Sequence, residues 1–334
     1  MLKLIVPFIF FNLFLIVIFT KFKNKFKIID NPDKEKKIHK LISYPIGGIF
    51  IYLSLIIFIS LDSIISTNLF SEYELTKFNK IYFFFFMTLF FLIGLIDDKF
   101  NLKPTIRLIL LFIIVLIFLQ YLQDFKVYRI YFKSIDFLLV LNSFSFLFTA
   151  ISIILLIQIL NFFDGIDLQL SLYAIFIFIY LFVITESLVL VFLIITLLFN
   201  LYLNKYQKIF LGDGGVYLIS FLISCLIIFN YNKNILIAEQ IFIILLIPFL
   251  DFFRLFFERL MARKNPMKGD LGHIHHLIIK NLGLSKTLII VNLLYLSPSI
   301  LYYFFDQNFE FISGFSIISY FLIIFYFKSK KTNF

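Results

Sequence analysis

Long apolar stretches alternate with short polar ones along this chain. Each apolar stretch has roughly 17–20 residues, the length that a helix needs to cross about 30 Å of hydrocarbon. Backbone groups in lipid must be hydrogen-bonded within their own segment, so helices are the expected form. The pattern predicts an all-α, polytopic integral membrane bundle of about eleven helices. The predicted spans are 2–20, 46–66, 80–96, 106–122, 144–160, 169–184, 187–203, 215–231, 235–253, 287–304 and 312–328.

The composition strengthens this prediction. Of the 334 residues, 62% are hydrophobic and 15% are charged, whereas soluble domains carry about 25% charged residues. The basic balance, with a pI near 9.4, would suit nucleic acid in a soluble protein. In a membrane protein it indicates basic cytoplasmic loops, so no nucleic-acid partner is expected. The only cysteine is Cys225, which excludes an intrachain disulfide. No linker or repeat divides the chain, so residues 1–334 are expected to form one domain.

The distribution of basic residues predicts the orientation in the membrane. The segments that would lie on one side hold 23 of the 30 Lys and Arg residues. Because cytoplasmic loops are enriched in Lys and Arg, this side is predicted to be cytoplasmic, with the N-terminus outside and the C-terminus inside. A short alternating stretch at 125–133 is too polar to span the membrane and is predicted to form a small external hairpin.

Polar residues that could carry chemistry gather on the predicted cytoplasmic side. They fall in five segments, which we expect to form one composite site at the membrane surface. These segments are 21–45, 97–107, 161–168, 204–215 and 254–286. Any one cluster has a simpler explanation, since charged residues at helix ends avoid lipid. The joint occurrence of acids, cations and histidines on one side favours a site.

Two of these segments are hard to explain by solvation alone. Asp97 and Asp98 are adjacent at the end of an apolar stretch, where they repel each other unless a cation lies near. Carboxylates are the ligands that Mg²⁺ uses, together with water and substrate phosphates. Asp213 lies among glycines, which allow close backbone approach and expose N–H groups that suit a phosphate. The pattern therefore predicts a metal-assisted site for phosphate chemistry.

Five motifs in order resemble the polyprenyl-phosphate N-acetylhexosamine-1-phosphate transferase family, in particular its WecA-like branch, which is related to the peptidoglycan translocase. The resemblance covers residues from about 28 to 285. The motifs are DNPDKEKKIHKLISYPIGG, GLIDDKFNLKPTIR, NFFDGID, IFLGDGG and NPMKGDLGHIHHLI. One departure follows Asp167, where the family usually has Gly-Leu-Ala and this chain has Leu168-Gln169-Leu170.

The resemblance implies a role for individual residues. Asp97 and Asp98 would be catalytic, and Asp213 and Asp97 would bind Mg²⁺ or Mn²⁺. The residues implied to bind substrate are Lys37, His39, Arg107, Asn161, Asp164, Asp167, Asp270, His273, His275 and His276. Zinc binding by the three clustered histidines is an alternative, but a fourth ligand is lacking and the many Asp residues favour Mg²⁺.

The implied reaction transfers an N-acetylhexosamine 1-phosphate from a UDP-sugar to undecaprenyl phosphate and releases UMP. It would be the first membrane step of a cell-envelope polysaccharide, of O-antigen, common-antigen or teichoic-acid type, at the cytoplasmic face of a bacterial inner membrane. The expected partners are these two substrates, the lipid bilayer and a second copy in a homodimer. A peptidoglycan translocase acting on UDP-MurNAc-pentapeptide and a membrane transporter are the alternatives. A transporter would carry its ionisable residues at mid-membrane.

Overall fold

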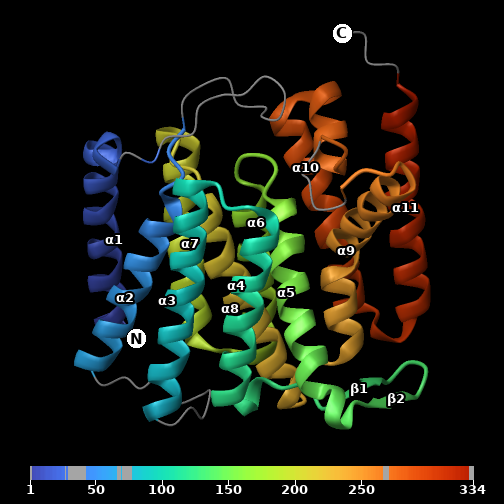
Figure 1. Ribbon diagram of the computed structural model, residues 1–334, viewed down its shortest axis with the longest axis horizontal. Helices are drawn as coiled ribbons and strands as arrows, with labels where there is room; N and C mark the ends of the chain where they lie inside the picture. The colour runs from blue at the N-terminus through green and yellow to red at the C-terminus, as the bar shows by residue number, and fades with distance from the viewer. Residues whose placement is uncertain are drawn as a thin grey trace.

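The computed structural model describes residues 2–26, 28, 43–65, 69, 77–265 and 271–330. In these residues eleven α-helices run side by side between two ends of a bundle (Figure 1). This arrangement confirms the predicted all-α bundle. The helices are α1 (Leu2–Phe22), α2 (Gly47–Ile65), α3 (Lys77–Phe100), α4 (Pro104–Tyr121), α5 (Ser145–Phe163), α6 (Gln169–Thr185), α7 (Leu188–Gln207), α8 (Gly212–Asn232), α9 (Ala238–Met261), α10 (Ile274–Phe304) and α11 (Phe309–Ser329).

The helices have the length and surface of membrane spans. Among the described residues, ten are apolar and long enough to cross a bilayer, and α6, with 17 residues, is the shorter apolar helix. Large apolar side chains remain exposed on the outside of the bundle, as for Phe10, Phe311 and Phe325. Such a surface is stable in lipid and would be unfavourable in water.

Helix α8 lies at the centre of the bundle and packs closely on its neighbours. Of the 18 consecutive residues of α8 that are most apolar, 89% are buried. The helix packs against α2, α3 and α5. Glycines permit the closest approach, because a Cβ on Gly48 in α2 would collide with the backbone of Gly215 in α8. The start of α8 is therefore fixed against α2 and α3, and this contact positions the site.

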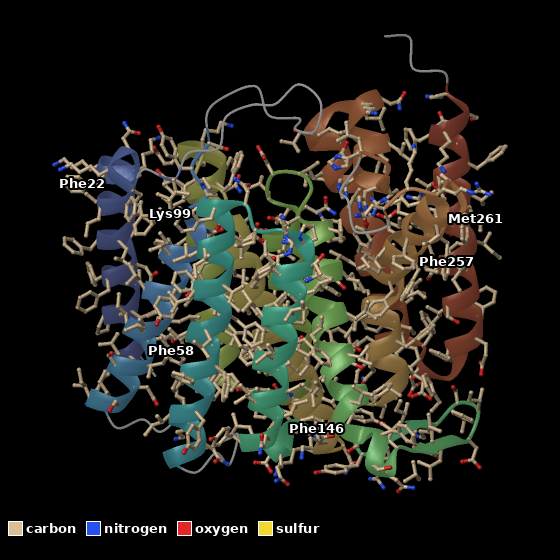
Figure 2. The ribbon with its side chains drawn as sticks, in the orientation of Figure 1. Phe22, Phe58, Lys99, Phe146, Phe257 and Met261 are labelled. Atoms are coloured by element: carbon tan, nitrogen blue, oxygen red, sulfur yellow. The ribbon has the colours of Figure 1, made fainter. Side chains whose placement is uncertain are left out.

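The two ends of the bundle differ in what they carry. Helix α1 ends at Phe22, at the same end as Lys99 of α3 and Met261 of α9, while Phe146 near the start of α5 lies at the opposite end (Figure 2). Strands β1 (Arg129–Phe132) and β2 (Phe137–Val140) pair antiparallel at the Phe146 end. The predicted hairpin is thus confirmed, although its second strand lies beyond the predicted stretch. The cytoplasmic placement of the Lys99 end stays a prediction from the charge bias.

The segment 254–286 is largely helical, so its prediction as a loop is wrong. Helix α9 continues to Met261, and α10 begins at Ile274 and is interrupted by non-helical backbone at Gly283 (φ 73°, ψ 171°). Hydropathy detects where lipid contact ends, whereas a helix continues as long as its backbone hydrogen bonds are satisfied. For the same reason α3 extends to Phe100, and α8 begins at Gly212.

Candidate active site

Asp98 links the end of α3 to the beginning of α8. Its carboxylate accepts hydrogen bonds from the backbone N–H groups of Asp213 (2.8 Å) and Gly214 (3.0 Å). The first N–H groups of a helix lack partners within the helix, and the N-cap residue of α8, Leu211, supplies no side-chain cap. Asp98 therefore caps α8 from another helix and fixes the backbone that carries Asp213.

Asp97, the adjacent residue, faces a different set of partners. Its Oδ2 accepts hydrogen bonds from Arg107 Nη1 (2.8 Å) and from the Tyr217 hydroxyl (3.1 Å), and its Oδ1 accepts one from the Leu102 backbone (2.9 Å). The side chain of Asp97 is only 4% exposed and that of Arg107 14% exposed. This ion pair brings a guanidinium group to the carboxylate cluster and holds it there.

The turn after α5 adds an amide and a further acid. Asn161 Nδ2 donates a hydrogen bond to Asp213 Oδ1 (2.7 Å). Asp164 follows directly after α5, where burial, then the charge of Asp213, then that of Asp167, raise the pKa of its carboxyl group to about 7. The turn ends at Leu168 with left-handed backbone (φ 72°), a conformation that favours glycine. This is the position at which the family usually has Gly.

The donor set of this group fits a divalent cation. Four carboxylates surround the start of α8, those of Asp97, Asp98, Asp164 and Asp213. Arg107 forms an ion pair with Asp97. Carboxylates at this density repel each other unless a cation lies between them. Mg²⁺ requires only one or two protein carboxylates, because waters and substrate phosphates complete its octahedron. No group of three His, Cys, Asp or Glu side chains in the described ranges has the arrangement of a metal site formed by protein ligands alone.

The three histidines lie together at the start of α10. Ring centroids are separated by 5.4 Å for His273 and His275 and by 4.2 Å for His275 and His276, and all three side chains are buried. A Cβ on Gly165 would collide with His275 Nε2, so the cluster packs directly on the turn that follows Asp164. The structure thus brings the histidines to the carboxylate group, with Gln169 Nε2 lying 3.5 Å from His275 Nδ1.

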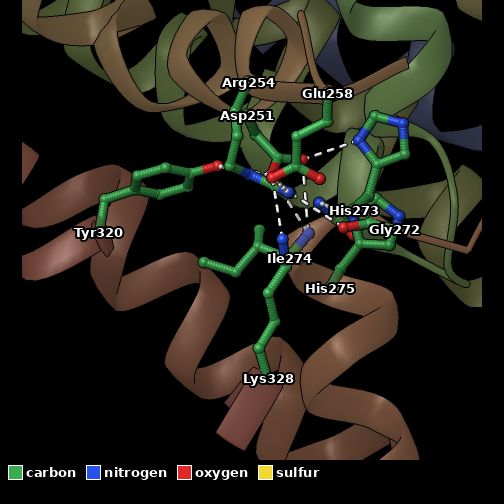
Figure 3. Close-up of polar contacts among 10 residues, drawn as sticks. Asp251, Arg254, Glu258, Gly272, His273, Ile274, His275, Tyr320 and Lys328 are labelled. Carbon is green, nitrogen blue, oxygen red and sulfur yellow. Dashed lines mark hydrogen bonds and ion pairs between the residues drawn. The ribbon is translucent and has the colours of Figure 1, made fainter. Parts of the chain in front are cut away.

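A second polar group supports the histidines from α9 and α11 (Figure 3). Asp251 lies 2.7 Å from His273 Nδ1 and also binds Arg254 and Tyr320. Sequence reasoning assigned none of these three residues to the site, and it missed Tyr217 and Gln169. A signal existed for Asp251 and Arg254, since an acid and a base three positions apart within an apolar helix lie on the same face. Tyr217, Gln169 and Tyr320 carry no such signal.

Three residues implied by the resemblance, Lys37, His39 and Asp270, lie outside the described residues. The others lie at one end of the bundle: Asp97, Asp98, Arg107, Asn161, Asp164, Asp167, Asp213, His273, His275 and His276.

The central part of the chain is similar in sequence to a known protein family. Residues 80–231, from α3 through α8, match the sequence model of glycosyl transferase family 4. The match includes the carboxylates, Asn161 and Arg107, and it ends before the histidine cluster. The family resemblance seen in the motifs is thereby confirmed.

A longer similarity extends over most of the chain. Over 282 residues this chain is 27% identical to an undecaprenyl-phosphate alpha-N-acetylglucosaminyl 1-phosphate transferase of Thermotoga maritima. The matched region covers 84% of this chain and 82% of that protein. The match to the family 4 model and a similarity of this extent support an enzyme, and the long apolar helices support a place in the membrane.

Proposed function

We propose that this protein transfers an N-acetylhexosamine 1-phosphate from a UDP-sugar to undecaprenyl phosphate. An oxygen of the lipid phosphate would bond to the sugar-linked phosphorus of the UDP-sugar. The bond from that phosphorus to the bridging oxygen would break, and UMP would leave with the bridging oxygen and its electron pair. The products are undecaprenyl-diphosphate-sugar and UMP.

The observation that carries this proposal is the carboxylate group at the start of α8, beside Arg107 and the histidines. Two anionic substrates must meet, so the site has to supply positive charge close to the membrane surface. The acids lie in the last turns of α3, the first turn of α8 and the turn after α5. This placement lets a polyprenyl tail remain in lipid while its phosphate reaches the group.

We propose Mg²⁺ as the cofactor, with Mn²⁺ as a substitute. Asp213 would be the principal ligand, with Asp97 or Asp164 as the second. When bound, the metal would offset the diphosphate charge and stabilise the leaving UMP. Asp98 would act on this centre through the backbone of α8, since both of its oxygens bind the N–H groups there.

The remaining residues of the site would bind and orient the substrates. Arg107, held by Asp97, offers a fixed guanidinium group to a phosphate. The imidazoles of the α10 cluster would bind the diphosphate of the UDP-sugar, because they lie beside the turn that carries Asp164. Lys37, His39 and Asp270 would complete the site from the segments implied by the resemblance. Little base catalysis is needed, because a lipid phosphate is already an anion near neutral pH.

The similarity to the Thermotoga maritima protein favours N-acetylglucosamine as the sugar. We therefore propose that the product begins a cell-envelope polysaccharide, with the site at the cytoplasmic face of a bacterial inner membrane. This orientation rests on the distribution of Lys and Arg residues.

The test is transfer by the purified protein in proteoliposomes that contain undecaprenyl phosphate and Mg²⁺. UDP-N-acetylglucosamine, UDP-N-acetylgalactosamine and UDP-MurNAc-pentapeptide would be supplied in turn, with UMP and the lipid product measured. We expect one UMP per lipid-linked N-acetylhexosamine, loss of turnover with EDTA, and recovery with Mg²⁺ or Mn²⁺. Product from UDP-MurNAc-pentapeptide alone, or UMP release without lipid, would contradict the proposal.

A further inference from the structure

Asp251 is a buried carboxylate in α9 that faces the histidine cluster. The residue is 3% exposed, and its Oδ2 lies 2.7 Å from His273 Nδ1. A carboxylate buried this deeply is unfavourable unless it is paired and hydrogen-bonded. The contacts of Asp251 therefore indicate its role.

The other contacts of Asp251 determine which atom of the pair carries the proton. Its Oδ1 accepts hydrogen bonds from Arg254 Nη2 (2.8 Å), the Tyr320 hydroxyl (2.8 Å) and the Ile274 backbone N–H (3.2 Å). Donors at this density favour the ionised carboxylate. An ionised carboxylate only accepts, so His273 Nδ1 must carry a hydrogen and donate it to Asp251.

This contact fixes how the imidazole of His273 is presented. The ring stacks on His275 at 5.4 Å and on Phe162 at 5.8 Å between centroids, which sets its plane. With Nδ1 bound to Asp251, the edge that bears Nε2 is left for a ligand, and within the described residues Nε2 has no hydrogen-bond partner. Both ring nitrogens of a doubly protonated imidazole are donors, so in that form Nε2–H can donate to an anionic ligand while Asp251 balances the charge.

We propose that Asp251 is a positioning residue for phosphotransfer, which holds His273 with Nδ1–H bound so that Nε2 faces the diphosphate of the nucleotide sugar. Arg254 and Tyr320 hold Asp251 in turn. Because Tyr320 lies in α11, the last helix of the bundle contributes to a site whose family match ends at residue 231. This inference rests on the proposed function, and its test separates the two.

The kinetic test is a double-mutant cycle in proteoliposomes with Asp251→Asn and His273→Ala. Asp251→Asn has nearly the same size and removes the charge, so kcat/KM for the UDP-sugar should fall about 10- to 100-fold, as expected for loss of a charged hydrogen bond. KM for undecaprenyl phosphate should stay within about twofold, since no contact to the lipid phosphate is removed. In the His273→Ala background, Asp251→Asn should cause less than about a twofold further loss.

The cycle separates positioning from a purely structural role. Asp251 also binds the Ile274 N–H at the start of α10, whose N-cap residue His273 provides no side-chain cap. If Asp251 acted only by holding this helix end, Asp251→Asn would disturb the whole cluster. The resulting fall in kcat/KM would then also appear in the His273→Ala background. Losses that multiply in the double variant would therefore overturn the proposal.

Two further variants keep the test decisive if Asp251→Asn does not fold. Tyr320→Phe removes one donor to Asp251 and should lower kcat/KM for the UDP-sugar about three- to tenfold, again with no further loss once His273 is absent. Glu258→Gln is the matched control, because Glu258 binds Arg254 (3.0 Å) and Lys328 (2.8 Å) on the exposed side of the same network. It should retain wild-type kinetics. A Glu258→Gln defect as large as that of Tyr320→Phe would contradict the proposal.

A spectroscopic readout does not depend on the transfer reaction. The chain has only four histidines, so the imidazole ¹⁵N signals of labelled protein can be assigned by loss of one set in His273→Ala. Wild type should show a protonated, strongly hydrogen-bonded Nδ1 at His273, and Tyr320→Phe or Asp251→Asn should shift that signal. An unchanged His273 signal in both variants would overturn the positioning role, even if the transfer activity is confirmed. If the His273 signal shifts in these variants but the wild-type protein transfers no sugar phosphate, the proposed function is refuted and the contact between Asp251 and His273 still stands.

Discussion

Asp98 and Asp213 are both acids of the carboxylate group, yet the structure predicts that replacement by Asn destabilises the protein at Asp98 and not at Asp213. In Asp98→Asn, one of the two carboxylate oxygens becomes an NH₂ group that faces a backbone N–H. One charged hydrogen bond is then lost, at about 1.5–3 kcal/mol, and two donors are left facing each other. Weaker repulsion within the acid group offsets part of this loss, so we expect a net destabilisation of about 2 kcal/mol.

Asp213→Asn should have a different outcome. The backbone N–H of residue 213 still binds Asp98, and the new amide oxygen can still accept the hydrogen bond from Asn161. Removal of one negative charge relieves repulsion, so stability should be unchanged or slightly higher. Turnover should still fall by orders of magnitude, because Asp213 is the proposed metal ligand.

The buried thiol of Cys225 provides the assay. It lies in α8 and is 1% exposed, and the chain has no other cysteine, so a thiol-reactive fluorophore reports unfolding of the helix that Asp98 caps. Asp98→Asn should unfold several degrees below wild type, and Asp213→Asn at or above it. Wild-type stability in Asp98→Asn would refute the capping role, and near-normal turnover in Asp213→Asn would exclude it as the metal ligand.

Three further predictions concern orientation, packing and backbone strain. In intact cells, a cysteine at Lys99 should resist a membrane-impermeant thiol reagent, whereas one at Asn234 should react; the reverse pattern would invert the topology. Gly165→Ala should displace His275 and lower kcat/KM for the nucleotide sugar about 10- to 100-fold without loss of the fold by thermal unfolding; unaltered kinetics would contradict the contact. Leu168→Gly should relieve left-handed backbone and raise the unfolding temperature by about 1–3 °C, and a decrease would show that its side-chain contacts outweigh the strain.

The membrane-spanning part of the fold could be predicted from the sequence because it depends on one local property. A stretch of apolar residues long enough to cross hydrocarbon must become a helix, and each predicted span overlaps an observed helix. Helix ends at the membrane surface depend on caps that come from elsewhere in the chain. Asp98 stabilises the start of α8 from 115 residues away, which no local pattern at Gly212 reveals.

The sequence likewise does not reveal that Asp97 and Asp98 have different partners. In the sequence they form one acidic pair, and both are implied to be catalytic. In a helix, consecutive side chains point about 100° apart, so Asp97 turns toward Arg107 and Tyr217 while Asp98 turns toward the first turn of α8. Two identical residues thus acquire different roles from the faces of α3 on which they lie.

The same geometry distinguishes the three histidines. Their spacing makes them look equivalent, but His273 has extended backbone (φ −61°, ψ 149°) just before α10, whereas the other two lie within its first turn. The extended residue, His273, is hydrogen-bonded to Asp251, 22 positions earlier in α9, while His275 packs on the turn after Asp164. In the proposed complex, the cluster would therefore present to the diphosphate one imidazole fixed by a carboxylate, with the neighbouring rings packed around it.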